Sequence, residues 1–76
     1  MDHQRYERYL NEYVQTAVRE SDGTARGIAE RLGEFHVGRF SFHREEKLRA
    51  LRDARQAFDE HRHWPVEIIL KQLGVG

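Results

Sequence analysis

The most informative stretch of this chain for its fold is residues 64–74, WPVEIILKQLG, which hold much of its apolar density. Pro65 suits a first helical position, and Gly74 suits the left-handed stop that ends a helix. On a helical wheel one face is apolar and consists of Val66, Ile69, Leu70 and Leu73. Ile68 projects from the opposite side, so the segment predicts a helix with more apolar surface than one intramolecular contact needs.

The rest of the chain is hydrophilic, with 34% charged residues and a mean hydropathy of −0.88 over 76 residues. We expect a single helical domain over residues 1–76, whose core is marginal because so short a chain buries only about 60–65% of its unfolded surface. Cysteine is absent, which excludes disulfides and thiolate metal sites. Small domains without such links often gain stability by oligomerising, and a homodimer is therefore a candidate state.

Two helices are predicted in the first half of the chain. Residues 2–20 carry an apolar stripe at helical spacing, with Asp2 as a candidate N-cap. Its members are Tyr6, Tyr9, Leu10, Tyr13, Val14, Ala17 and Val18. The second helix is predicted to begin after the N-cap Thr24 and to run to Leu32, with Gly33 as its stop. Gly27 should weaken it by roughly 1 kcal/mol relative to alanine.

A third helix is predicted from about Phe42 to His61 or Arg62, with Ser41 as its N-cap. The second and third helices are joined by residues 34–42, EFHVGRFSF, in which apolar and polar residues alternate around Gly38. This pattern is typical of a very short hairpin. The alternative is an irregular connector whose aromatic side chains plug the core. The sequence thus predicts an all-α bundle of about four helices with a short aromatic connector.

The centres of the four apolar faces should form the core. The side chains expected to be largely buried are Leu10, Val14, Ile28, Leu32, Leu51, Phe58, Ile69 and Leu73. Thirteen basic and thirteen acidic residues cancel, so no overall field draws the chain to nucleic acid or membrane. The longest apolar run is residues 68–70, which predicts no membrane span and no membrane partner. We expect a cytoplasmic protein, and eleven Arg against two Lys suits a GC-rich bacterium or its phages.

No residue set in the chain indicates a reaction, a cofactor or a metal. Ser21 and Ser41 occupy turn or cap positions, and no glycine-rich phosphate loop occurs. Five histidines include the pair His61 and His63, which would point about 160° apart on a helix. We therefore expect a protein that is not an enzyme and holds neither cofactor nor metal.

Nucleic-acid binding is the alternative hypothesis. Residues 24–33, TARGIAERLG, loosely resemble part of a helix-turn-helix motif, although aromatic residues follow where a second short amphipathic helix should begin. A helix-turn-helix-like transcriptional regulator would use basic side chains on and near the third helix. The candidate nucleic-acid-binding residues are Arg26, Arg39, Arg44, Arg52 and Arg55.

The preferred hypothesis is a contact with another protein, because Arg and Trp are enriched at binding hot spots. Leu48 lies among arginines on the third helix like an apolar anchor with a guanidinium rim. The candidate protein-binding residues are Arg44, Leu48, Arg52, Arg55, Trp64 and Ile68. The expected function is that of a small regulatory or inhibitory protein of unidentified partner. Inhibitors of this size from phages and mobile elements, of the anti-CRISPR type, are a class-level analogy.

Overall fold

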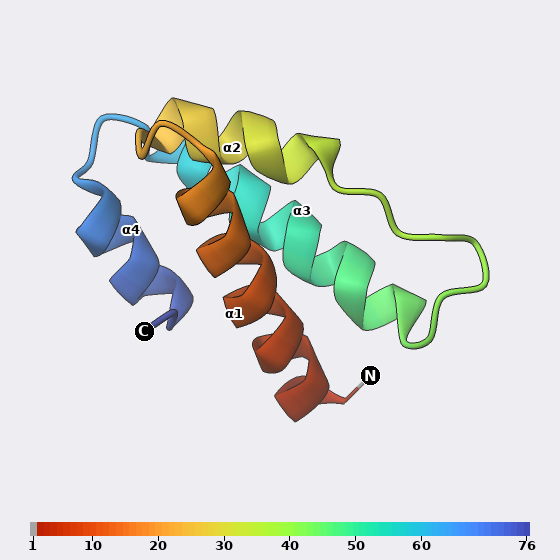
Figure 1. The fold of residues 1–76 in the computed structure, drawn as a ribbon. Helices are drawn as coiled ribbons and strands as arrows, with labels where there is room; N and C mark the ends of the chain where they lie inside the picture. Colours follow the sequence, from red (N-terminus) through yellow and green to blue (C-terminus); the bar gives the residue numbers. More distant parts are fainter. Residues whose placement is uncertain (1) are drawn as a thin grey trace.

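Four helices and no strand make up residues 2–76, the part of the chain described by this computed structural model (Figure 1). They are α1 (His3–Glu20), α2 (Ala25–Glu34), α3 (Arg44–Glu60) and α4 (Val66–Leu73). The predicted all-α fold is confirmed. The hairpin alternative for residues 34–42 is wrong, because that segment contains no ladder and instead crosses from α2 to α3 as an irregular connector.

The first three helices pack against one another, and α4 is added at one side (Figure 1). After the bend at residues 61–65 the chain turns back, so that α4 contacts the end of α3 and its tail reaches α1. There the Gln15 side-chain amide donates a hydrogen bond of 3.0 Å to the Gly76 carbonyl. The connector lies at the opposite side of the molecule from α4 (Figure 1). It therefore does not cover Ile68, which remains 40% exposed on α4.

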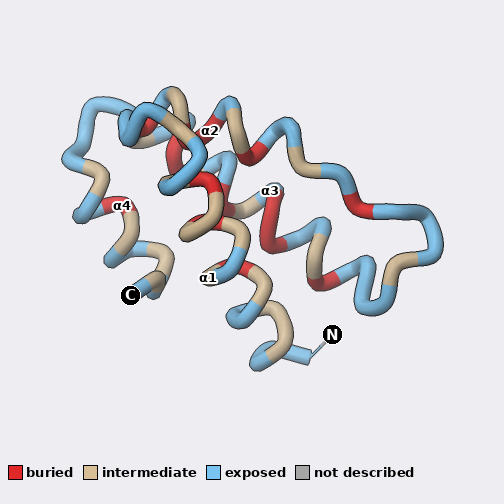
Figure 2. Tube along the Cα trace, in the orientation of Figure 1, coloured by how far each residue is buried: buried red, intermediate tan, exposed pale blue. Residues whose placement is uncertain are grey.

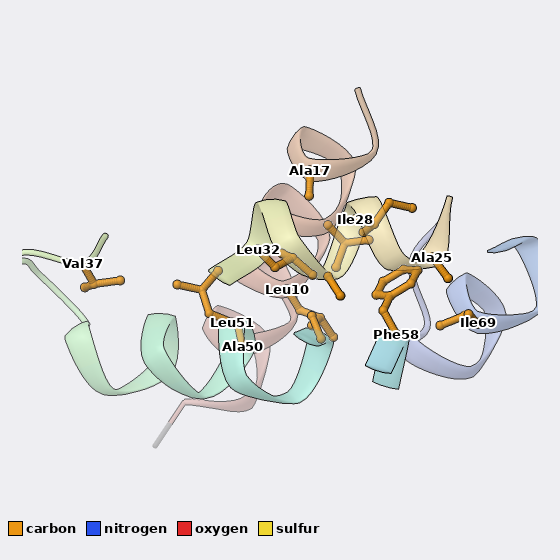
Figure 3. Close-up of a cluster of buried hydrophobic side chains, with 13 residues drawn as sticks. Leu10, Ala17, Ala25, Ile28, Leu32, Val37, Ala50, Leu51, Phe58 and Ile69 are labelled. Carbon is orange, nitrogen blue, oxygen red and sulfur yellow. The ribbon is translucent and has the colours of Figure 1, made fainter. Parts of the chain in front are cut away.

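Side chains from all four helices form one buried cluster (Figure 3). Phe58, Ile28, Ile69 and Val14 are its largest fully buried members. Seven of the eight predicted core residues are buried, whereas Leu73 is only half-buried because α4 ends there at the molecular surface. Alanines complete the cluster and let the helices approach closely: Ala17, Ala25, Ala29, Ala50 and Ala54.

The helix ends follow the capping rules in three places and break them in two. The side chains of Asp2 and Thr24 cap α1 and α2, and Gly74 ends α4 with a φ of 75°. The prediction of Ser41 as the N-cap of α3 is wrong, since His43 occupies that position with a left-handed φ of 56° and no side-chain hydrogen bond. Gly33 does not stop α2, which continues to Glu34.

The connector turns two apolar side chains inward and two outward. Phe35 is half-buried and Val37 is buried, and Val37 marks one end of the core in Figure 3. Phe40 and Phe42, by contrast, are 92% and 84% exposed. The expectation that the connector aromatics plug the core is therefore correct for Phe35 and wrong for Phe40 and Phe42.

One acidic side chain is buried among these helices. Glu46 of α3 lies beside the start of α1, where its carboxylate accepts a hydrogen bond of 3.4 Å from the Asp2 backbone amide. A negative charge at this place complements the positive end of the α1 dipole. Glu46 therefore helps to hold the start of α1 against α3.

No helix in the described part of the chain is both long and apolar enough to cross a bilayer.

Candidate functional site

The outer face of α3 brings together four of the six predicted protein-binding residues. The helix buries one side, which includes Ala50, Ala54 and Phe58, against α1 and α2. At 100° per residue the side chains on the opposite side must face solvent. The residues placed there as predicted are Arg44, Leu48, Arg52 and Arg55, all exposed.

Two adjoining hollows run along this face, and we call them together the α3 groove. One has a volume of about 450 Å³ and lies between α3 and the end of α2. The other, of about 460 Å³, lies toward the start of α3. Leu48 and Arg52 line both hollows, and Leu48 is 38% exposed at the junction. The predicted apolar anchor therefore lies at the centre of the groove.

The floor of the α3 groove is apolar and comes from three residues that the site prediction did not include. Leu32 and Leu51 are buried core residues whose edges line the groove, and Phe35 is half-buried beside them. The Phe35 ring is held from two sides. The Tyr13 ring lies 5.5 Å away, centroid to centroid, and the Arg31 guanidinium lies 4.9 Å from the Phe35 centroid. A fixed ring makes this wall a firm surface rather than a mobile one.

Gly33 shapes the same wall of the α3 groove by having no side chain. A Cβ atom at Gly33 would lie 3.0 Å from the Arg55 guanidinium carbon. The Arg55 guanidinium therefore lies flat over the last turn of α2, where a positive charge is favoured by the helix dipole. The absence of a side chain at Gly33 thus leaves room for the Arg55 guanidinium, whereas the sequence predicted that Gly33 ends the helix.

Charges of both signs surround the apolar floor. The positive side chains that line the α3 groove are Arg44, Arg49, Arg52 and Arg55. The negative ones are Glu45, Asp59 and Glu60, so four positive charges face three negative ones. The acids Asp59 and Glu60 lie in the last turn of α3, whereas the arginines extend to its start. A surface of this kind matches a partner with mixed charge better than a uniformly negative one.

Trp64 and Ile68, the other two predicted protein-binding residues, do not line the α3 groove. They lie at the bend after α3 and on α4, where they are 42% and 40% exposed. The Trp64 ring stacks on His61 with centroids 3.9 Å apart and an angle of 14° between the planes. We call Trp64 and Ile68 the α4 patch. The six predicted protein-binding residues therefore lie on two separate surfaces.

The nucleic-acid alternative relied on Arg26 and Arg39 as well, and neither lines the α3 groove. Arg26 is in the first turn of α2 and pairs with Glu30 at 3.4 Å. Arg39 is in the connector, with its guanidinium 5.8 Å from the Phe40 centroid. Residues 35–43 separate α2 from α3, whereas a helix-turn-helix motif joins its helices through a turn of about 3–4 residues. The five arginines therefore do not form one continuous basic surface.

The largest pKa change in the described chain is that of Tyr6, which lies outside the α3 groove and takes part in a hydrogen bond between two helices. Burial and then a hydrogen bond to Asp53 raise the pKa of Tyr6 to about 12. The Tyr6 hydroxyl donates to the Asp53 carboxylate at 2.6 Å and joins α1 to α3. Arg52 pairs with the other Asp53 oxygen at 3.7 Å. The Asp53 carboxylate therefore has a structural role. It links Tyr6 of α1 to Arg52, which lines the α3 groove.

The two serines serve local structure. The Ser21 hydroxyl donates to the Val18 carbonyl at 3.2 Å, and the Ser41 hydroxyl accepts from the Lys47 ammonium at 2.6 Å. Within residues 2–76, no three side chains of the metal-binding types lie close enough to hold an ion.

Comparison with protein families, with curated proteins and with solved structures finds no match to this chain.

Proposed function

We propose that this protein is a small non-enzymatic regulator or inhibitor that acts by binding another protein through the α3 groove. One observation carries the proposal: an exposed leucine, Leu48, lies at the centre of a groove with an apolar floor and a rim of mixed charge. Protein interfaces commonly place an apolar anchor at the centre and polar side chains at the edge.

The α3 groove suits a helical or extended segment of the partner. An apolar side chain of that segment would cover Leu48 and the exposed edges of Leu32 and Leu51. Acidic groups would meet Arg52 and Arg55, and a basic group would meet Asp59 or Glu60. Arginines next to an apolar floor are well suited to this task, because their stems add apolar contact while their planar heads bind carboxylates in pairs.

DNA binding is the weaker proposal because of the charge of the same surface. A protein that holds a nucleic-acid backbone neutralises phosphates with a continuous set of Lys and Arg side chains. Three carboxylates line the α3 groove beside its four arginines, and Arg26 and Arg39 lie outside it. The carboxylates would repel a phosphate backbone, so the surface favours a protein partner.

The biological setting is proposed by analogy only. A compact helical protein that blocks another protein would suit a phage or mobile element that disables host machinery in the cytoplasm, CRISPR effectors included. No cofactor is part of this proposal. Self-association, which would make the active form a homodimer, is proposed to use the α4 patch and to leave the α3 groove open.

The proposal is tested by capturing partners from the native host with the wild-type protein and then measuring the affinity of each purified partner. Leu48→Glu should weaken a true partner by about tenfold or more, because it places a charge at the apolar centre. Arg26→Glu is the matched control, since Arg26 is exposed on α2 outside the α3 groove. A partner with equal affinity for both variants would contradict the proposed site.

A salt titration on generic duplex DNA separates the two proposals. Binding that falls steeply as salt rises, and that weakens with Arg52→Gln but not with Leu48→Ala, would favour the DNA-binding regulator. The protein-binding proposal expects no retention on duplex DNA at physiological salt.

A further inference from the structure

The tip of the connector exposes more apolar side chain than any other part of the described chain. Phe40 and Phe42 are 92% and 84% exposed, whereas the next large apolar side chain, Trp64, is 42% exposed. We call residues 39–44 the aromatic tip. In Figure 2 most of the connector is coloured as exposed, and it stands away from the helices. Two phenylalanines held in water at a protruding site mark a surface that meets an apolar phase or partner.

The outward direction of these two rings is set by contacts at the base of the aromatic tip. The Ser41 amide donates to the Gly38 carbonyl at 3.1 Å, which closes a turn. The Ser41 hydroxyl accepts from the Lys47 ammonium at 2.6 Å, so Ser41 is tied to α3. Phe40 therefore lies within a closed turn and Phe42 lies in the next turn, one on each side of the tied Ser41, and both rings face water.

A left-handed residue then joins the aromatic tip to α3. His43 has a φ of 56°, which is uncommon for a residue other than glycine. This conformation costs free energy and persists only because the surrounding structure holds it. Its ring lies 6.3 Å from the Tyr9 ring of α1, centroid to centroid. The backbone conformation and the ring contact both fix the direction in which the tip leaves the helices. The exposure of the two phenylalanines is therefore built into the fold.

The charged side chains within residues 35–44 have one sign, and the nearest acids along the chain are Glu34 and Glu45 at its two ends. Residues 35–44 contain Arg39 and Arg44 with two histidines, and all thirteen acidic residues of the chain lie elsewhere. The Arg39 guanidinium lies 5.8 Å from the Phe40 centroid, so a cation stands directly beside one exposed ring. In a chain of zero net charge, this segment is a local exception that would be drawn to a negatively charged surface.

We propose that the aromatic tip inserts Phe40 and Phe42 into the interface of an anionic lipid bilayer, with Arg39 and Arg44 at the level of the headgroups. A stable protein interface needs about 800 Å² and roughly 20–30 residues on each side, which a protruding tip of six residues does not offer by itself. A bilayer interface accepts each apolar side chain separately, and each nearby cation adds attraction to anionic lipid.

This proposal differs from the sequence expectation of no membrane partner. That expectation followed from the net charge and from the short apolar runs of the sequence, and neither quantity describes a two-residue tip. The α3 groove lies along the helix that follows the tip, and only Arg44 belongs to both. A protein held on a bilayer by the aromatic tip would therefore keep most of the groove free for its partner.

The test is sedimentation with vesicles of phosphatidylcholine alone and of phosphatidylcholine mixed with phosphatidylglycerol. The wild type should bind the mixed vesicles, and the double variant Phe40→Ala/Phe42→Ala should lower the partition coefficient by about tenfold or more. The double variant Phe40→Leu/Phe42→Leu is the matched control, because it keeps an apolar side chain at both positions and should retain most of the binding. Circular dichroism checks that each variant is folded.

A second arm tests the charge. Arg39→Gln should weaken binding to the mixed vesicles, whereas Arg26→Gln should leave it unchanged, and added salt should weaken the wild type. The proposal is overturned if the wild type does not sediment with the mixed vesicles. It is also overturned if the phenylalanine variant and its control bind equally. A purified protein partner that requires Phe40 and Phe42 in the absence of vesicle binding would assign the aromatic tip to that partner instead.

Discussion

Gly27 and Gly33 both lie inside α2, yet a methyl group would meet different neighbours at the two positions. At Gly27 it would overlap the Asp22 carboxylate, which accepts hydrogen bonds from the Thr24 hydroxyl at 2.7 Å and the Thr24 amide at 3.0 Å. Thr24 in turn caps the Gly27 amide at 3.0 Å. At Gly33 it would meet only the mobile end of Arg55. The sequence-based estimate that Gly27 merely weakens the helix therefore misses its role in the cap.

Gly27→Ala should lower the free energy of unfolding by about 1 kcal/mol, because the methyl group displaces Asp22 and disturbs the Thr24 cap. Gly33→Ala is the matched variant, and its gain in helix propensity of up to about 1 kcal/mol should offset the displacement of Arg55. Urea unfolding of both variants measures the difference. Equal stability of the two variants, or a more stable Gly27→Ala, would contradict this account of the turn.

The cap also gives an acid dependence of known sign. Hydrogen bonds from the Thr24 hydroxyl and then from its amide lower the pKa of Asp22 below its ordinary value of 3.8. A lowered folded-state pKa means that the cap contributes fully above the unfolded-state value and loses its contribution as pH falls through the folded-state value. Asp2, which caps α1, has its pKa lowered first by the Arg5 amide and behaves in the same way.

Tyr6 gives the opposite dependence at high pH. Burial and the Asp53 hydrogen bond raise its pKa from 10.0 to about 12, so the neutral phenol is favoured in the folded protein. Its contribution to stability is complete below pH 10 and is lost as pH rises toward about 12. Tyr6→Phe should remove this part of the alkaline loss and cost about 1 kcal/mol at neutral pH. Urea unfolding from neutral to alkaline pH compares the variant with the wild type.

The matching control for Tyr6 is an absorbance titration of the tyrosines. Asp53→Asn should shift the titration of one tyrosine toward its ordinary value, since the carboxylate raises the Tyr6 pKa by hydrogen bonding and by its charge. An unchanged titration in Asp53→Asn would show that the 2.6 Å contact does not hold the phenol in solution.

At the scale of the element, α3 carries the core on one face and the candidate site on the other. Phe58 is fully buried, and Leu48 is 38% exposed at the centre of the α3 groove. Phe58→Ala should cost about 3–5 kcal/mol and unfold much of a domain this small. Leu48→Ala should cost much less, about 1 kcal/mol, because Leu48 lies outside the buried cluster and 38% of its surface is already in contact with water. Thermal melts followed by circular dichroism measure both.

A loss below about 1 kcal/mol in Phe58→Ala would mean that α3 faces the other way. Its two faces were predictable from sequence, because Leu51 and Phe58 repeat with the period of a helix while Arg44, Leu48 and Arg52 occupy the other side. The floor of the groove was not predictable in the same way. Leu32 and Phe35 come from another helix and its exit, so their place beside Leu48 depends on how α2 crosses α3.

The connector shows why a pattern of alternating residues does not determine direction. Phe35, Val37, Phe40 and Phe42 read equally well as a hairpin or as core side chains. Phe35 and Val37 turn inward, whereas Phe40 and Phe42 face water on either side of Ser41, which the Ser41–Lys47 hydrogen bond ties to α3. That bond joins residues on either side of a helix start that the sequence placed too early. The orientation therefore follows from the tertiary position of Lys47, which no local pattern gives.

For the whole molecule, the α4 patch predicts self-association. Trp64 and Ile68 remain about two-fifths exposed in the single chain, and the connector does not reach them. A two-fold contact would bury the same patch twice without any further sequence. Light scattering at micromolar concentrations should show a dimer for the wild type and a monomer for Ile68→Glu. Phe42→Glu is the control, because it adds the same charge to an exposed apolar site at the other side.

The dimer would be contradicted if the wild type is a monomer and Ile68→Glu changes neither its mass nor its melting temperature.

Four helices, their approximate ends and seven of the eight core residues followed from periodicity and caps, since these are local rules. The separation of Trp64 and Ile68 from Leu48 did not, because it depends on the bend after α3. The sequence indicated that these side chains are exposed but could not say how many separate surfaces they form.

The way in which α4 is attached has a consequence for motion. Ile69 is its only buried residue, whereas α1, α2 and α3 each contribute at least three to the core. Val66, Leu70 and Leu73 of α4 pack against the core but are only half-buried. A helix attached through one fully buried and three half-buried side chains should detach while the other three helices remain folded, so the molecule should open in two steps rather than one. Amide hydrogen exchange in α4 should then be faster than in α1 and α3 by orders of magnitude. Proteolysis under native conditions should first cut the bend at residues 61–65 and release α4 from an otherwise intact three-helix remainder.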